Sequence, residues 1–107
     1  SPCFKLNYHF AVSDMAQLMQ NSGKTGWLYR VVAGGLVSGD APLELVSRLS
    51  DVSVHEAGAI AWHMPFDDEQ YHRLLSAAGL SVSWSRTLQK RRLSGQIEDN
   101  SRRLWGK

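Results

Sequence analysis

The chain has 107 residues, 43% hydrophobic and 21% charged, which is typical of one globular domain or of parts of two small ones. It contains no apolar run near the roughly 20 residues that span a bilayer and no visible signal peptide, which argues against a membrane protein. Its single cysteine, Cys3, can form no internal disulfide and therefore indicates a reducing, cytoplasmic compartment. Because the chain starts without an initiator Met, we expect a fragment or a processed product.

The first stretch of the chain predicts an extended segment followed by one helix. Residues 4–10 follow Pro2 and are expected to be extended. Residues 14–22 carry apolar side chains at positions i, i+3 and i+4, the spacing of an amphipathic helix. Ser13 is the expected N-cap of that helix and Gly23 its C-cap.

Two strands are predicted next. Residues 25–32, TGWLYRVV, are rich in aromatic and β-branched side chains, and residues 43–48, LELVSR, begin with alternating apolar and polar positions. The glycine-rich stretch between them is typical of a turn. Two or three strands cannot close a sheet or bury both of its faces, so this half of the chain requires further strands from elsewhere.

The second half of the chain predicts three short helices. Ser53 and Glu56 form an S-x-x-E capping box, and the residues that follow place their apolar side chains on one helical face. The second helix is expected to carry an amphipathic stripe of Tyr71, Leu74, Leu75 and Ala78, and the third to turn Trp84 and Leu88 inward. The expected N-caps are Ser53, Asp67 and Ser81, and the expected stops are Pro65, Gly79 and Gly95. Residues 96–107 are predicted to be a tail that packs through Ile97, Leu104 and Trp105.

Charge is distributed unevenly along the chain. Residues 1–85 carry five Lys/Arg and eight Asp/Glu, a net charge of −3, whereas residues 86–107 carry seven Lys/Arg and two acids, a net charge of +5. A basic C-terminal segment predicts an acidic partner, either nucleic acid or protein, or else a solvated helix face. Arg86, Lys90, Arg91 and Arg92 do not share one stripe of the third helix, which disfavours phosphate tracking and makes nucleic acid the less favoured partner.

Several motifs that suggest other chemistry fail on spacing. Gly23-Lys24-Thr25 lacks the earlier glycine and the preceding strand of a phosphate-binding loop. His55-Glu56 lacks the second histidine of a zinc protease. The acids and histidines between residues 63 and 72 straddle a proline without regular spacing and are better explained as surface and capping residues than as metal ligands.

Cys3 is the remaining candidate for chemistry. A lone cysteine is usually a small buried hydrophobic residue. Here it follows a proline that holds the backbone extended, and it precedes Lys5, a cation that would favour the thiolate, the form that acts as nucleophile or soft-metal ligand. His9 is about 20 Å away on an extended segment and is therefore not a suitable base.

The sequence as a whole resembles the C-terminal half of YiiM-type members of the MOSC family, named after the molybdenum cofactor sulfurase C-terminal domain. The stretches that carry the resemblance are SPCFKLN, GWLYRVVAGGLVSGD and WHMPFDDEQYHRLLSAAGLSVSW. The resemblance implies an α+β fold, in which residues 1–49 are the C-terminal piece of a MOSC β-barrel and residues 50–107 are a helical 3-alpha domain. Family members are longer, and their N-terminal half supplies most barrel strands.

The resemblance also implies a function. Cys3 matches the cysteine that binds molybdenum in a pterin cofactor (molybdopterin), and by position Lys5 and Asn7 are candidates to contact that cofactor. The implied activity is molybdenum-dependent reduction of N-hydroxylated compounds, such as 6-N-hydroxylaminopurine, to amines, with electrons from a flavin or iron–sulfur protein. The 107 residues alone are expected to be inactive. The alternative is a helical module that binds nucleic acid or protein, with Cys3 incidental.

Overall fold

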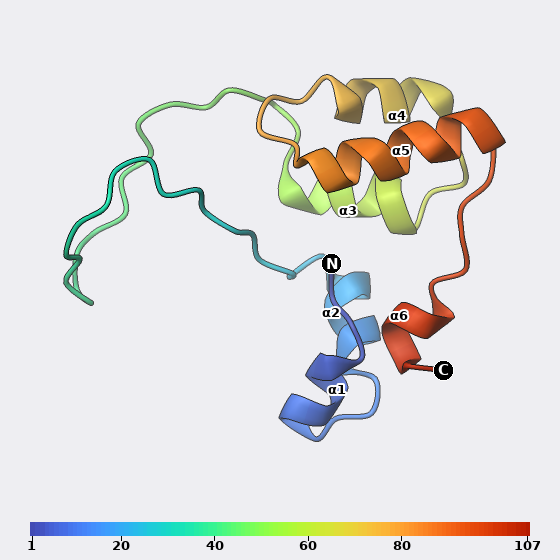
Figure 1. Cartoon of the computed structure of the whole chain (residues 1–107), viewed down its shortest axis with the longest axis horizontal. Helices are drawn as coiled ribbons and strands as arrows, with labels where there is room; N and C mark the ends of the chain where they lie inside the picture. The colour runs from blue at the N-terminus through green and yellow to red at the C-terminus, as the bar shows by residue number, and fades with distance from the viewer.

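The computed structural model describes residues 1–107 and contains six helices and no β-strand. In chain order the helices are α1 (Lys5–Phe10), α2 (Met15–Ser22), α3 (Val54–Trp62), α4 (Asp68–Leu75), α5 (Val82–Ser94) and α6 (Ser101–Trp105). Figure 1 shows them in two groups, with α3, α4 and α5 packed together and α1 and α2 beside α6. None of the helices combines the length and apolarity that a bilayer crossing requires.

The predicted N-caps of the second half are confirmed, as is Gly95 as the C-cap of α5, whereas the expected stop at Gly79 is wrong, because α4 ends at Leu75 with Ser76 as its C-cap. Ser53 and Glu56 form the complete capping box at the start of α3. Asp67 accepts a hydrogen bond from the Gln70 amide at the start of α4, and Ser81 caps α5. These side chains satisfy amides that the first helical turn leaves without partners, so the helices begin where the local sequence directs.

The core of the three-helix group consists of four buried side chains, one or more from each helix: Ile60, Tyr71, Leu74 and Leu88. The predicted apolar stripe of α4 supplies Tyr71 and Leu74, which are 0% and 1% exposed. Burial of each such side chain contributes roughly 1.5–3 kcal/mol to folding. This group is therefore stabilised by its own core.

Residues 95–100 connect the two groups of helices and lead into α6. The chain leaves α5 at Gly95, whose φ of +65° is a left-handed conformation that glycine adopts without strain. It then runs back to α6, which packs against α2 and buries Leu104. The expectation of a packed tail is confirmed for Leu104, while Trp105 remains 40% exposed.

The α+β fold expected for residues 1–49, with strands of a MOSC β-barrel, is wrong for this structure. Residues 24–50 contain neither helix nor strand, and they loop away from the helices in Figure 1. Between residues 25 and 49 the backbone forms one internal hydrogen bond, from the Ala41 amide to the Ser38 carbonyl. A strand exists only when its backbone pairs with another strand, and here the apolar side chains stay exposed, Leu28 by 98% and Val32 by 96%.

The expected extended segment at residues 4–10 is also wrong, because most of it is helix α1. With no strand beside it, the backbone satisfies its hydrogen bonds locally: the Leu6 amide donates to Cys3 and the Asn7 amide to Phe4. α1 also packs against α2, to which it is joined by a short turn. The apolar pattern of Phe4–Phe10 was therefore compatible with a short helix as well as with a strand.

Candidate functional site

Cys3 lies just before α1, between the buried Pro2 and the half-buried Phe4. Its thiol is free and the residue is partly exposed. It borders a cleft with a volume of about 650 Å³. The cleft therefore brings the one soft donor predicted from sequence to a space large enough for a small molecule.

The cleft lies where the two groups of helices meet. Its walls come from the N-terminal segment, from α3 and α5, and from the connection that leads into α6. Residues 61 and 62 are more than 55 positions from Cys3 in the sequence, and residues 98–103 are about 100 positions away. The lining side chains used below are Cys3, Phe4, Trp62, Trp84, Arg102 and Arg103.

One wall of the cleft is aromatic. Trp62 on α3 and Trp84 on α5 meet edge to face, with ring centroids 5.5 Å apart. The Arg103 guanidinium lies over the Trp62 ring, 5.5 Å from its centroid, within the range of a cation–π contact. This wall offers aromatic surface beside a positive charge.

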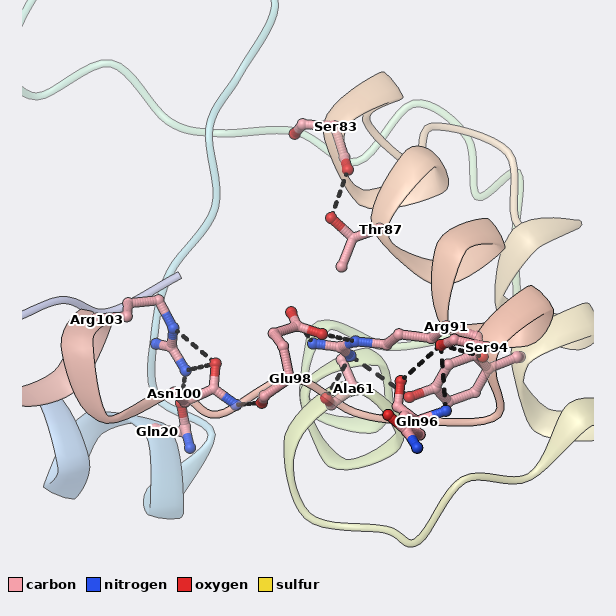
Figure 2. A network of polar contacts seen from close by, with 11 residues as sticks. Gln20, Ala61, Ser83, Thr87, Arg91, Ser94, Gln96, Glu98, Asn100 and Arg103 are labelled. Carbon is pink, nitrogen blue, oxygen red and sulfur yellow. Dashed lines mark hydrogen bonds and ion pairs between the residues drawn. The ribbon is translucent and has the colours of Figure 1, made fainter.

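Arg103 is the most connected side chain at the cleft. Its Nη1 donates to the Pro2 carbonyl at 2.5 Å, and its Nη2 donates to Gln20 Oε1 and to Asn100 Oδ1. Figure 2 shows Arg103 beside Asn100 and Gln20. Burial lowers the pKa of its guanidinium, as does the nearby Arg91, whereas Cys3 and Glu98 act in the opposite direction.

Arg91 and Glu98 form a second cluster, at the other end of the connection (Figure 2). Arg91 is 4% exposed and also donates to the Ala61 carbonyl at 2.8 Å. Its hydrogen bonds to Glu98 raise the pKa of Arg91 and lower the pKa of Glu98. This pair fixes the connection against α3 and α5 and so helps to set the shape of the cleft.

The other two predicted site residues lie away from the cleft. Lys5 is exposed on α1, and its side chain forms no hydrogen bond or ion pair. Asn7 is half-buried, and both ends of its amide are used inside the fold: Nδ2 donates to the Leu104 carbonyl and Oδ1 accepts from the Ala16 amide. The structure therefore shows Asn7 joining α1, α2 and α6.

Not all cations of the basic segment, residues 86–107, are free to bind a partner. Arg91 is neutralised by Glu98, and Arg92 forms an ion pair with Asp68 at 2.5 Å. The cations of this segment that form no ion pair are Arg86, Lys90, Arg102, Arg103 and Lys107. Two of the four arginines and lysines of α5 are thus already paired within the chain.

Sequence reasoning did not find Arg103, Trp62 or Trp84 as parts of a site. Arg103 was counted only as one charge among seven, and Trp84 as an inward side chain. No local spacing connects Arg103 to Pro2, which are 101 residues apart. The high density of tryptophan, four in 107 residues, was the one signal that pointed to an aromatic surface.

Comparison with family models places two families on this chain. The model "YiiM-like, 3-alpha helix domain" matches residues 52–95, and the model "MOSC domain" matches residues 1–44. The first match coincides with α3, α4 and α5, and the second includes Cys3.

Two curated proteins are similar to the chain. Protein YiiM of Escherichia coli (strain K12) is 80% identical over 107 residues, which cover 100% of this chain and 48% of that protein. The uncharacterized protein YflK of Bacillus subtilis (strain 168) is 39% identical over 92 residues, 85% of this chain and 42% of that protein. The chain thus spans about half the length of the curated relatives it matches.

Solved structures are similar to the chain over almost all of its length. A crystal structure of YiiM from Escherichia coli matches with a TM-score of 0.93 and 80% identity, covering 99% of this chain and 53% of that one. A crystal structure described as a hypothetical protein gives the same TM-score and identity, covering 99% of this chain and 49% of that one. Agreement at this level extends to the arrangement of the helices around the cleft.

Proposed function

We propose, since the chain belongs to the YiiM-type MOSC family, that it supplies the metal-binding cysteine and one wall of the active site of a molybdenum cofactor-dependent reductase. The observation that carries the proposal is the position of Cys3, the family-motif cysteine, at the edge of the cleft lined by Trp62, Trp84 and Arg103. The single cysteine supports a reducing, cytoplasmic setting. Because the relatives are about twice as long, the complete site would include residues beyond these 107.

The residues present fit a metal most of whose ligands are supplied by a cofactor. The chain has no group of three or more His, Cys, Asp or Glu side chains arranged to hold a metal ion. Cys3 offers one soft sulfur, which suits a metal whose other positions are filled by sulfur atoms of a pterin cofactor. Cys3 would therefore hold the cofactor's metal, while Lys5 stays a candidate for the cofactor's anionic groups because its ammonium is free.

When bound, the cofactor would supply two-electron chemistry that removes the oxygen of an N-hydroxyl group as water and leaves an amine. The residues of this chain would bind and orient the substrate. Trp62 and Trp84, which meet edge to face, provide an aromatic wall against which a planar ring, such as that of an N-hydroxylated purine, can pack. Arg102, exposed at the cleft and without an ion pair, is available to a polar or anionic substituent of the substrate.

The electron donor is proposed to be an acidic flavin or iron–sulfur protein. The support is the basic C-terminal segment, in which Arg86 and Lys90 on α5 are exposed and form no ion pair. Complementary charge increases the rate at which two proteins meet. Arg91 and Arg92 are not part of this surface because their charges are used within the chain.

The experiment that tests the proposal is molybdenum analysis of a full-length YiiM-type protein whose C-terminal half is this chain. We expect close to one molybdenum per protein, and a large loss in Cys3→Ser. Thr87→Ala, on the same cleft, is the matched control and should keep its metal.

Retention of metal in Cys3→Ser would remove Cys3 from the metal's ligands. Absence of metal from every variant, in cells shown to make the cofactor, would contradict the reductase. The chain would then be better explained as a helical binding module for nucleic acid or protein.

A further inference from the structure

Arg103 contacts both neighbours of Cys3. Its carbonyl accepts a hydrogen bond from the Phe4 amide, with 2.7 Å between nitrogen and oxygen. Its guanidinium donates to the Pro2 carbonyl at 2.5 Å. The peptide groups on the two sides of the cysteine are therefore attached to one residue of α6, about 100 positions later in the chain.

The guanidinium is itself held from several directions. It donates to Gln20 Oε1 on α2 and to Asn100 Oδ1 beside α6, and it covers the Trp62 ring of α3. A planar fork of five N–H donors can meet all these groups at once, whereas a lysine ammonium of the same charge cannot. The contacts fix the plane of the guanidinium and, through it, the Pro2 carbonyl.

Arg103 is half-buried and forms no ion pair, unlike Arg91 and Arg92. A partly buried cation without a carboxylate loses hydration that the protein does not fully replace. Burial accordingly lowers the pKa of Arg103, and Cys3 is one of two groups that act in the opposite direction.

We propose that Arg103 is the positioning residue for Cys3: it holds the cysteine's flanking peptides against α6 and thereby fixes where the sulfur sits at the cleft. The inference rests on the proposed role of Cys3 as metal ligand. Arg103 acts on the metal through Cys3 and not by direct contact.

The first experiment uses the metal-free chain. The variants are Arg103→Met, which removes the charge and the N–H donors, and Arg103→Lys, which keeps the charge but lacks the planar guanidinium group. Arg102→Met is the matched control, since Arg102 is the adjacent cleft residue and forms no hydrogen bond to the N-terminal segment. Amide hydrogen exchange is measured by NMR at Phe4 and, as a reference for the folded core, at Leu74.

In Arg103→Met the Phe4 amide keeps its acceptor, the backbone carbonyl of residue 103, but the segment loses the charged hydrogen bond to the Pro2 carbonyl and opens more readily. We therefore expect exchange at Phe4 to be about tenfold faster, with exchange at Leu74 unchanged. Arg103→Lys should fall between Arg103→Met and the unsubstituted chain, and Arg102→Met should match the latter. Unchanged exchange at Phe4 in Arg103→Met would overturn the proposal. If Arg103→Met does not fold, the comparison of Arg103→Lys with Arg102→Met decides in the same way.

The second experiment uses the full-length, metal-loaded protein that contains this chain. The electron paramagnetic resonance spectrum of Mo(V) reports the geometry of the metal–sulfur bond, which a role confined to stability would leave unchanged. We expect an altered spectrum in Arg103→Lys and an unaltered one in Arg102→Met. An unaltered spectrum in Arg103→Lys, with Cys3 shown to bind the metal, would overturn the positioning role. If Cys3→Ser keeps its metal, it is the proposed function that fails, and the exchange result still decides whether Arg103 holds the segment.

Discussion

Arg91 and Glu98 form a two-point ion pair, in which Nε and Nη2 of the guanidinium lie 2.7 and 2.6 Å from the two carboxylate oxygens. Arg91 is almost fully buried, whereas the Glu98 side chain is 54% exposed. The pair joins the end of α5 to the connection that leads to α6. It therefore links the stability of the three-helix group to the position of the segment that carries Arg103.

Glu98→Gln is expected to destabilise the chain by about 1.5–3 kcal/mol, the usual contribution of a hydrogen bond to a charged group. The cost arises because the substitution leaves a buried guanidinium without its counter-charge, although Arg91 keeps its bonds to Ala61 and Tyr71. Urea unfolding, monitored by circular dichroism, measures the change. Glu44→Gln, on an exposed residue without a partner, should change the midpoint little. Equal effects of the two substitutions would contradict a role for the ion pair.

The same pair predicts a pH dependence. Arg91 lowers the pKa of Glu98 below its usual 4.5, so the folded state favours the ionised carboxylate. The resulting stability is present above pH 4.5, and it is lost as the pH falls through the lower pKa of the folded state. Melting temperatures of the unsubstituted chain and Glu98→Gln, measured from pH 7 to pH 2.5, should therefore converge at acid pH. A constant difference over this range would show that Glu98 does not act through its charge.

Gly23→Ala is expected to destabilise the chain more than Gly26→Ala. Both glycines have left-handed backbone conformations, with φ of +69° and +67°. A methyl group on Gly23 would overlap the His55 ring at the contact between α2 and α3, whereas nothing lies within 4 Å of one on Gly26. Thermal unfolding of the two variants gives the difference. His55→Ala should reduce the cost of Gly23→Ala, and an unchanged cost in that double variant would show that backbone strain alone is responsible.

Charge reversal at Arg86 and Lys90 is expected to weaken reduction by an acidic electron donor. With both residues changed to Glu in the full-length protein, the donor concentration for half-maximal turnover should rise several-fold at low salt, and the effect should shrink as salt screens the charges. Lys24→Glu, outside the basic segment, is the control. Turnover that responds to neither salt nor these substitutions would remove the proposed docking surface.

The 107-residue chain by itself is expected not to retain the cofactor. Residues 26–49 are exposed throughout and have almost no internal backbone pairing, so they form no rigid wall for a ligand. Incubation with cofactor followed by gel filtration and metal analysis tests this, with the full-length protein as the positive control. Stoichiometric, stable binding by the chain alone would contradict the expectation.

The sequence by itself determined the features that depend on neighbouring residues. The capping box of Ser53 and Glu56, the cap at Asp67 and the apolar stripe of α4 are local, because each joins positions within one or two helical turns. These features were sufficient to predict α3, α4 and α5. The same local patterns misassigned residues 4–10 and the strands at 25–32 and 43–48, since a strand needs a pairing partner and a pattern does not supply one.

Only the tertiary structure decided how the candidate site is built. Arg103 reaches Pro2 across 101 positions, and Trp62 meets Trp84 because α3 and α5 pack against each other. It also decided which cations are available, since Arg91 and Arg92 found acidic partners seven and 24 residues away. Contacts between distant segments form only when the chain folds, and no spacing within either segment encodes them.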